Sequence, residues 1–155
     1  MRVLVIGSGA REHAILARLS LEVGVDGLLV APGNPGIAEL AECVPIGTMD
    51  LPALAAFARD NKVDLVIPGP EAPLVAGLTD AMDEVGVACF GPSMAAAALE
   101  GSKTFTKQVA DAAGIPTAAW KRFTDADAAL EYVRGQNAPI VVKADGLAAG
   151  KGVVI

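Results

Sequence analysis

The sequence has few of the residue types that build disulfide frameworks, zinc sites or nucleophilic triads. Its 155 residues include two cysteines, Cys43 and Cys89, and their wide separation indicates buried thiols rather than a disulfide or a zinc site. The single histidine, His13, stands one turn into a predicted helix and forms no triad pattern with a serine or cysteine. We therefore predict no metal ligands in this chain.

Long apolar runs and basic clusters are also missing. Although 53% of the residues are hydrophobic, no uninterrupted apolar stretch is long enough to cross a membrane, and the apolar run 3–6 is too short for a signal peptide. The formal net charge is -6, and no basic cluster or aromatic platform offsets it, which argues against nucleic acid and acidic membranes as partners. We expect a cytoplasmic protein that binds small anions locally.

Short apolar runs alternate with helical patterns through the first part of the chain. We expect strands at residues 3–6, 28–31, 43–46, 65–67 and 87–90, and helices from residue 11, at 51–59 and at 72–84. This alternation predicts an α/β fold with a doubly wound parallel sheet.

The pattern changes after residue 93, where two helices are expected at 94–100 and 103–113, the second capped by Ser102. An extended stretch and a helix at 125–134, capped by Thr124, lead to the last apolar run. We place a boundary between these parts and predict domains at residues 1–118 and 119–155.

A glycine turn joins the first strand to the first helix. Such a turn aims backbone N–H groups and the positive end of a helix dipole at one point, which suits a phosphate. The dinucleotide pattern G-x-G-x-x-G would need glycine in place of Glu12 and an acidic residue after the second strand, and both are missing. Arg11 puts a guanidinium beside the turn, which favours a monophosphate over a dinucleotide. The alternative for Arg11 and Glu12 is that they form an exposed first helical turn.

Glu71 follows the strand 65–67, at the edge where the carboxyl ends of parallel strands gather ligand groups. A carboxylate at this place can bind a ligand, or it can stabilise the start of the next helix through the helix dipole. The residues alone leave both roles open.

The segment 139–155 sets a lysine on an apolar strand beside a glycine-rich loop. The β-branched run 140–142 is typical of a buried strand, and Lys143 at its end needs an anion as a partner. The loop that follows holds three glycines, which let the backbone approach a ligand closely, and a second lysine: Gly146, Gly150, Lys151 and Gly152. It lacks the hydroxyl residue that follows the lysine of a P-loop, and a second strand comes next. We predict a flap over phosphates, with a hairpin carrying solvated lysines as the alternative.

Five motifs together resemble one enzyme family. They are G-S-G-A-R-E-H-A at 7–14, P-G-N-P-G at 32–36, G-P-E-A-P-L-V-A-G at 69–77, G-P-S at 91–93 followed by L-E-G-S-K at 99–103, and P-I-V-V-K-A-D-G-L-A-A-G-K-G-V at 139–153. Their order and spacing resemble the phosphoribosylamine-glycine ligases, also called glycinamide ribonucleotide synthetases, of the ATP-grasp superfamily.

This resemblance implies a pre-ATP-grasp, Rossmann-like domain followed by the start of an ATP-grasp domain. It also implies an ATP-dependent carbon-nitrogen ligase of purine biosynthesis, in which glycine becomes an acyl phosphate and the amine of 5-phosphoribosylamine attacks it. The products would be glycinamide ribonucleotide, ADP and phosphate. ATP and Mg²⁺ or Mn²⁺ are the implied cofactors, with the metal ligands expected beyond residue 155.

The resemblance also implies roles for individual residues. The ribose-phosphate side would be bound by Gly9, Arg11, Glu12, Asn34, Pro35 and Gly36, and the sugar or its amine by Glu71. The ATP side would be bound by Lys103, Lys143, Gly146, Gly150, Lys151 and Gly152. Lys143 and Arg11 are the residues expected to act in catalysis.

Two features depart from the family pattern. Ala10 stands where the family usually has a second glycine, which keeps the N–H donor but narrows the space for a phosphate. Family chains are also much longer, so we expect this piece alone to be inactive. We expect its unpaired strand edge either to leave the segment from about Thr124 onward disordered or to pair with the same segment of a second molecule, and we favour pairing. A non-catalytic phosphate-binding module and another ATP-grasp carboxylate-amine ligase are the alternatives, whereas a nicotinamide-dependent oxidoreductase would need the third glycine of the turn.

Overall fold

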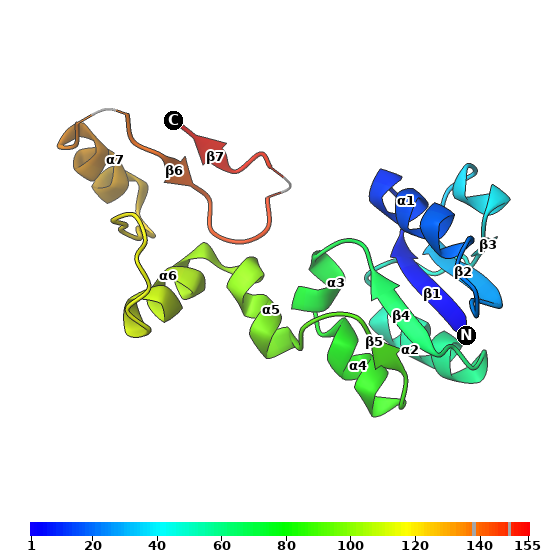
Figure 1. The fold of residues 1–155 in the computed structure, drawn as a ribbon. Coiled ribbons are helices and arrows are strands. Elements are labelled where there is room, and N and C mark those ends of the chain that lie inside the picture. The colour runs from blue at the N-terminus through cyan, green and yellow to red at the C-terminus, as the bar shows by residue number, and fades with distance from the viewer. Residues whose placement is uncertain (138, 149) are drawn as a thin grey trace. The chain divides into compact units, whose positions relative to one another are not determined.

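The computed structural model describes residues 1–137, 139–148 and 150–155 (Figure 1). It divides into two compact units, Met1–Ala97 and Ala98–Ile155. The predicted boundary between residues 118 and 119 stays a prediction, because a division into compact units need not coincide with the limits of folding domains.

The first unit is built on a parallel five-stranded sheet with the order β3-β2-β1-β4-β5. Its strands are β1 (Arg2–Gly7), β2 (Gly27–Pro32), β3 (Glu42–Cys43), β4 (Leu65–Pro68) and β5 (Ala88–Cys89). The chain builds outward from β1 to β3 on one side and then from β4 to β5 on the other. This confirms the predicted doubly wound α/β sheet and places its switch point between β1 and β4.

Both faces of the sheet are covered, which explains why its central strands are apolar throughout. On one face Leu4 and Ile6 of β1 pack with residues of α2 (Leu51–Asp60) and α4 (Leu78–Glu84). On the other face Val3 and Val5 pack with Leu16 of α1 (Ala10–Leu19) and with Ile37 of the short 3-10 helix η1 (Ile37–Glu39). Alternation along β1 therefore assigns successive residues to opposite layers.

Three expectations for this unit need correction. The helix expected at 72–84 is two helices, α3 (Ala72–Val75) and α4, because Gly77 between them has a φ of 100°. The expected strands at 43–46 and 87–90 shorten to two residues each at the sheet edges. Neither thiol is fully buried: Cys43 is exposed because β3 is the edge strand, and Cys89 is half-buried.

The division between the two units falls within α5 (Met94–Gly101). The second unit continues with α6 (Lys103–Ala112), α7 (Ala126–Arg134), β6 (Val142–Lys143) and β7 (Val153–Val154). The Ser102 hydroxyl accepts from the Phe105 N–H, which confirms the predicted cap of α6. The cap of α7 is Asp125 rather than Thr124, because the Asp125 carboxylate accepts from the Ala128 N–H.

The predicted strand-loop-strand at the end of the chain is an antiparallel hairpin, with Lys143 opposite Val153. Its first strand is not buried, since Val141 is 50% and Val142 49% exposed. Across the described residues, the structure contains no helix that is both long and apolar enough to span a membrane.

Candidate functional site

Three loops meet at the carboxyl edge of the parallel sheet, after β1, β2 and β4. The Gly33 N–H donates to the Gly7 carbonyl at 3.1 Å, and the Gly69 N–H donates to the Ile6 carbonyl at 2.8 Å. The end of β1 is thus bonded to the loops on both sides of it. This is the place in a doubly wound sheet where ligands bind.

The turn after β1 leads directly into α1. Gly9 is the N-cap residue in an extended conformation, and Gly7 has a φ of 134°, a region that favours glycine. The Glu12 carboxylate folds back and accepts from the Gly9 N–H at 2.6 Å, as in one half of a capping box. Only 6% of Glu12 is exposed, so the alternative of an exposed first turn is wrong for this residue.

Arg11, the neighbour of Glu12, is exposed at the rim of this edge. Its guanidinium donates to the carbonyl oxygen of Gly69, in the loop after β4. A guanidinium has five N–H donors, so this bond leaves donors for an anion at the same edge. The predicted location of Arg11 beside the glycine turn is therefore compatible with phosphate binding.

Asn34 ties the loop after β2 to the turn after β1. Its Nδ2 donates to the Ser8 carbonyl at 2.8 Å, while its Oδ1 accepts from the Ile37 N–H at 3.0 Å. Pro35 beside it is exposed, and a Cβ atom on Gly36 would lie 3.4 Å from the ring of His13. These predicted residues lie at the same sheet edge as the turn, and His13 packs against their loop.

Glu71 lies in the loop after β4, at the start of α3, and is half-buried. Its side chain accepts no capping hydrogen bond from that helix. Glu71 is nevertheless the N-cap residue of α3, so its role toward the helix dipole and its role toward a ligand both stay predictions. Its carboxylate lies at the sheet edge that carries Arg11 and Gly69.

The second unit brings the glycine loop to the start of α6. The Lys103 ammonium donates to the Gly146 carbonyl at 2.8 Å. The Asp145 carboxylate accepts from the Ser102 hydroxyl at 3.2 Å and from the backbone N–H groups of Thr104 at 3.3 Å and Gly146 at 3.0 Å. Hydrogen bonds from Thr104, and then from the Gly146 and Lys103 backbone, lower the pKa of Asp145 to about 2.

A cavity of about 580 Å³ opens beside this contact. Its lining includes two cations predicted for the ATP side and three aromatic rings: Lys103, Lys143, Trp120, Phe123 and Tyr132. The Lys121 ammonium lies 5.3 Å from the Phe123 ring and 4.9 Å from the Tyr132 ring. Cations beside aromatic surface suit a nucleotide, whose phosphates are anionic and whose base can stack.

The other predicted residues of the loop lie outside that lining. Gly146 and Gly150 have φ values of 86° and 76°, as the turn requires, and the Ala144 N–H donates to the Gly152 carbonyl at 2.7 Å to close the loop. Lys151 is exposed. A closed turn therefore joins the two strands as predicted, but no side-chain hydrogen bond among the described residues links Lys143 with Lys151.

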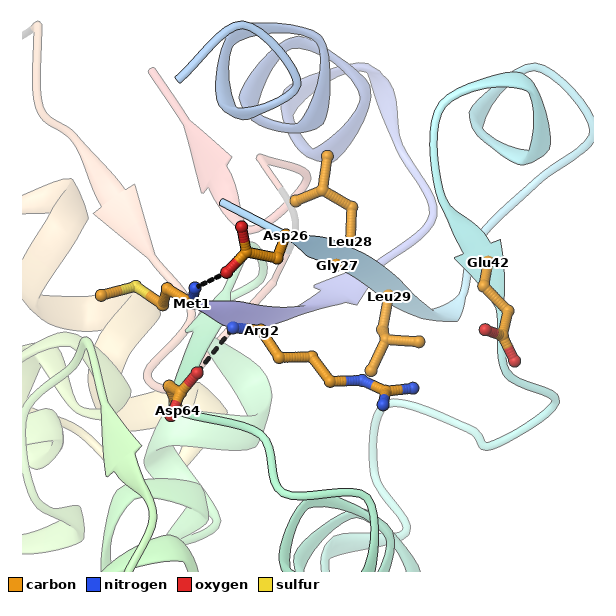
Figure 2. Close-up of a pocket in the computed structure, with 8 residues that line it drawn as sticks. All are labelled: Met1, Arg2, Asp26, Gly27, Leu28, Leu29, Glu42 and Asp64. Carbon is orange, nitrogen blue, oxygen red and sulfur yellow. Dashed lines mark hydrogen bonds and ion pairs between the residues drawn. The ribbon is translucent and has the colours of Figure 1, made fainter. Parts of the chain in front are cut away.

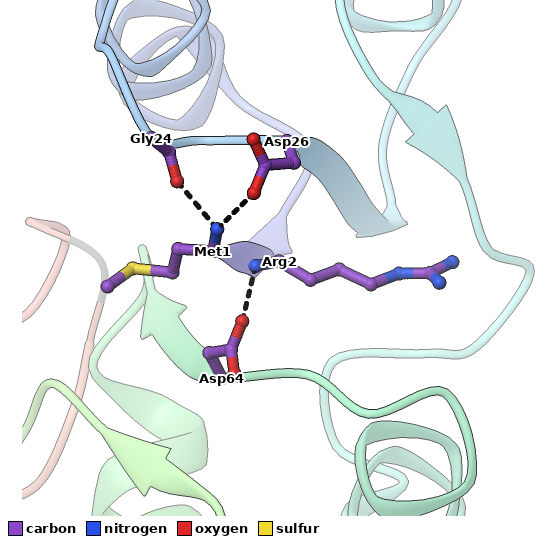
Figure 3. A network of polar contacts seen from close by, with 5 residues as sticks. All are labelled: Met1, Arg2, Gly24, Asp26 and Asp64. Atoms are coloured by element: carbon purple, nitrogen blue, oxygen red, sulfur yellow. Dashed lines mark hydrogen bonds and ion pairs between the residues drawn. The ribbon is translucent and has the colours of Figure 1, made fainter.

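A second cavity, of about 500 Å³, lies at the opposite edge of the parallel sheet, where the strands begin (Figure 2). The terminal amine of Met1 donates to the Gly24 carbonyl and to the Asp26 carboxylate, both at 2.6 Å, and the Arg2 N–H donates to Asp64 at 2.6 Å (Figure 3). These bonds hold strand starts together. No predicted site residue lines this cavity, so we assign it no part in the site.

Comparison with known proteins agrees with the two-part structure. Residues 1–100 match the family model described as phosphoribosylglycinamide synthetase, N domain, and residues 101–155 match the one described as its ATP-grasp (A) domain. The chain belongs to the phosphoribosylglycinamide synthetase family.

Relatives of this synthetase family match over the whole chain. It is 55% identical over 155 residues to the phosphoribosylamine-glycine ligase of Agrobacterium fabrum and 57% identical to that of Brucella melitensis. The crystal structure of the Thermotoga maritima phosphoribosylamine-glycine ligase superposes with a TM-score of 0.79 at 29% identity, covering 99% of this chain and 35% of that one. The chain spans 36% to 37% of the length of these curated relatives.

Sequence reasoning missed two features of this chain. The first is that the Asp145 carboxylate accepts hydrogen bonds from the start of α6. The sequence indicated this only through the place of Asp145 between Lys143 and Gly146 in the motif K-A-D-G. The burial of Glu12 had no sequence signal beyond the three-residue spacing from Gly9 that is typical of a capping box.

Proposed function

We propose that this chain is part of an enzyme that ligates glycine to 5-phosphoribosylamine with ATP, giving glycinamide ribonucleotide, ADP and phosphate. The observation that carries the proposal is the meeting of Arg11, Asn34 and Glu71 at one edge of the sheet, in a chain that matches both family models. Three hydrogen-bonding side chains beside a glycine turn suit a phosphorylated sugar.

In this proposal the first unit binds the sugar phosphate. Gly9, Arg11 and the loop 34–36 serve its phosphate side, and the Glu71 carboxylate accepts hydrogen bonds from a sugar hydroxyl or the amine. Arg11 also neutralises charge during the reaction.

The second unit contributes to ATP binding, and the donor set fits this role. Lys103 and Lys143 line the cavity and would offer ammonium groups to phosphate oxygens, while Gly146, Gly150, Lys151 and Gly152 form the loop that covers them. Among residues 1–137, 139–148 and 150–155, no three His, Cys, Asp or Glu side chains cluster as metal ligands do. The residues that would hold Mg²⁺ or Mn²⁺ and the inactivity of the piece alone both stay predictions.

The test is an assay with glycine, ATP and phosphoribosylamine on the 155-residue chain and on the protein at full family length. We expect glycinamide ribonucleotide and ADP from the full-length protein only. ADP formation with a different carboxylate or amine would indicate another carboxylate-amine ligase. Phosphate binding without turnover at full length would indicate a non-catalytic module.

A cytoplasmic location and self-association of the piece belong to the same proposal. Cell fractionation tests the location, and light scattering tests the self-association.

A further inference from the structure

Glu12 carries a buried carboxylate at the carboxyl edge of the parallel sheet, where the proposed function places the sugar phosphate. The side chain is 6% exposed, and one oxygen, Oε2, accepts from the Gly9 N–H at 2.6 Å. A buried carboxylate needs compensation, and here the first turn of α1 supplies it through that bond and through the positive end of the helix dipole.

Glycines from two separate loops surround this carboxylate. A Cβ atom on Gly7 would come within 2.6 Å of Cδ of Glu12, and one on Gly9 within 3.0 Å of Oε2. From the loop after β4, a Cβ atom on Gly69 would come within 1.8 Å of Oε1. Glu12 thus fills the space between the turn after β1 and the loop after β4.

Gly69 is the informative position among the three. Its φ lies outside the range from +20° to +160°, so its φ does not disfavour an alanine, and the three atoms nearest to the new Cβ would all belong to the Glu12 side chain. The neighbouring Arg11 holds the same loop by donating to the Gly69 carbonyl. Two consecutive residues of α1 therefore fix the position of one loop, one by a hydrogen bond and one by filling space.

We propose that Glu12 is a positioning residue, whose buried carboxylate sets the spacing between the Gly7–Gly9 turn and the Gly69 loop at which the edge binds a sugar phosphate. The ligand part of this inference rests on the proposed function. Glu12 then serves the ribose-phosphate side through the backbone rather than by touching the ligand.

The first test is a double-mutant cycle on thermal unfolding of the chain. Gly69→Ala alone should lower Tm by roughly 5 to 10 °C, because overpacking at a buried contact forces a shift. In a Glu12→Ala background the same change should cost less than about 2 °C, because the opposing atoms are gone. Gly47→Ala is the matched control, since its Cβ meets no atom within 4 Å, and it should have the same small effect in both backgrounds. An equal cost of Gly69→Ala in both backgrounds would overturn the proposal.

The second test measures the affinity for ribose 5-phosphate by calorimetry, at a temperature where every variant is folded. Glu12→Gln keeps an oxygen that can accept from the Gly9 N–H, so its affinity should stay within about threefold of the original or rise, whereas Glu12→Ala should lose roughly tenfold or more. An equal loss in both variants would mean that the charge itself contacts the ligand, which contradicts a positioning role. If the unaltered chain binds no ribose 5-phosphate, the proposed function of this edge fails, and the unfolding cycle alone decides whether Glu12 sets the loop spacing.

Discussion

Lys103 and Gly146 are joined by a 2.8 Å hydrogen bond from the lysine ammonium to the glycine carbonyl, across 43 positions of sequence. The bond holds a cation at the base of the glycine loop and beside the cavity of the second unit. Next to it the Asp145 carboxylate accepts from residues at the start of α6. The start of α6 and the base of the loop are therefore joined by hydrogen bonds from the Lys103 ammonium and to the Asp145 carboxylate.

We first predict a pH dependence for this contact. The pKa of Asp145 is lowered from 3.8 to about 2, so the folded state favours the ionised form. The stabilisation is then fully present above pH 3.8, declines as the pH falls through about 2, and is absent below that. Asp145→Asn should lower Tm at pH 7, and carboxyl NMR of the unaltered chain should show Asp145 titrating near 2. A midpoint at the ordinary value would contradict the hydrogen-bonded arrangement.

The second prediction concerns Lys103 and nucleotide affinity. In the full-length protein, Lys103→Met should weaken ADP binding by about tenfold to a hundredfold, because a charge-assisted hydrogen bond contributes roughly 1.5 to 3 kcal/mol. Lys121→Met is the control, since its ammonium lies over the rings of Phe123 and Tyr132 in the same cavity. Isothermal calorimetry measures the ADP affinity of both variants. Equal losses of affinity would mean that Lys103 acts only through the general positive charge of the cavity.

The third prediction separates catalysis from stability at Lys143. This residue is exposed on β6, so Lys143→Met should leave Tm and ribose 5-phosphate binding nearly unchanged. The rate of the full-length enzyme should fall strongly, because the ammonium would no longer neutralise charge on the ATP phosphates. Lys143→Arg, which keeps the charge, should recover part of the rate. A variant that loses Tm and both ligands to the same degree would indicate a structural lysine instead.

Much of the first unit could be predicted from the sequence, because apolar runs and glycine turns are local signals. The strand of residues 3–6 and its glycine turn follow from such signals, and the topology then places every loop that follows a strand at one edge. The break at Gly77 was missed because the apolar pattern of residues 72–84 continues through it, and only the backbone shows the left-handed conformation.

The details of the site depend on contacts between distant segments, which local patterns do not report. Arg11 was expected beside the turn, but its bond to Gly69 spans 58 positions. The bond from the Thr104 N–H to Asp145 spans 41 positions, and the exposure of Val142 depends on what lies against the hairpin. The motifs therefore predicted the candidate residues, whose roles stay predictions, while the hydrogen bonds among these residues required the structure.

The fourth prediction tests Asn34 as the link between two loops. Asn34→Ala removes hydrogen bonds to Ser8 and Ile37 and should cost roughly 1 to 3 kcal/mol of stability, with a severalfold loss of ribose 5-phosphate affinity. Asn61→Ala is the matched control, because Asn61 also donates to a carbonyl, that of Phe57 in α2, away from the sheet edge. The control should lower stability without changing affinity. If Asn34→Ala had the same ribose 5-phosphate affinity as Asn61→Ala, the Asn34 loop would not be part of the binding site.

The last prediction concerns Arg11, whose guanidinium already donates to the Gly69 carbonyl. Because other N–H donors of the same group remain, a phosphate at the turn can bind without breaking that bond, and Arg11→Ala should lower ribose 5-phosphate affinity by about tenfold to a hundredfold. Arg11→Lys should recover only part of the loss, since an ammonium cannot bind a phosphate in the bidentate manner of a guanidinium. Arg18→Ala on the same helix is the control, because Arg18 pairs on the surface with Glu22 and should leave the affinity unchanged. A dissociation constant that stays the same in Arg11→Ala, measured by calorimetry at two salt concentrations, would exclude this edge as the phosphate site.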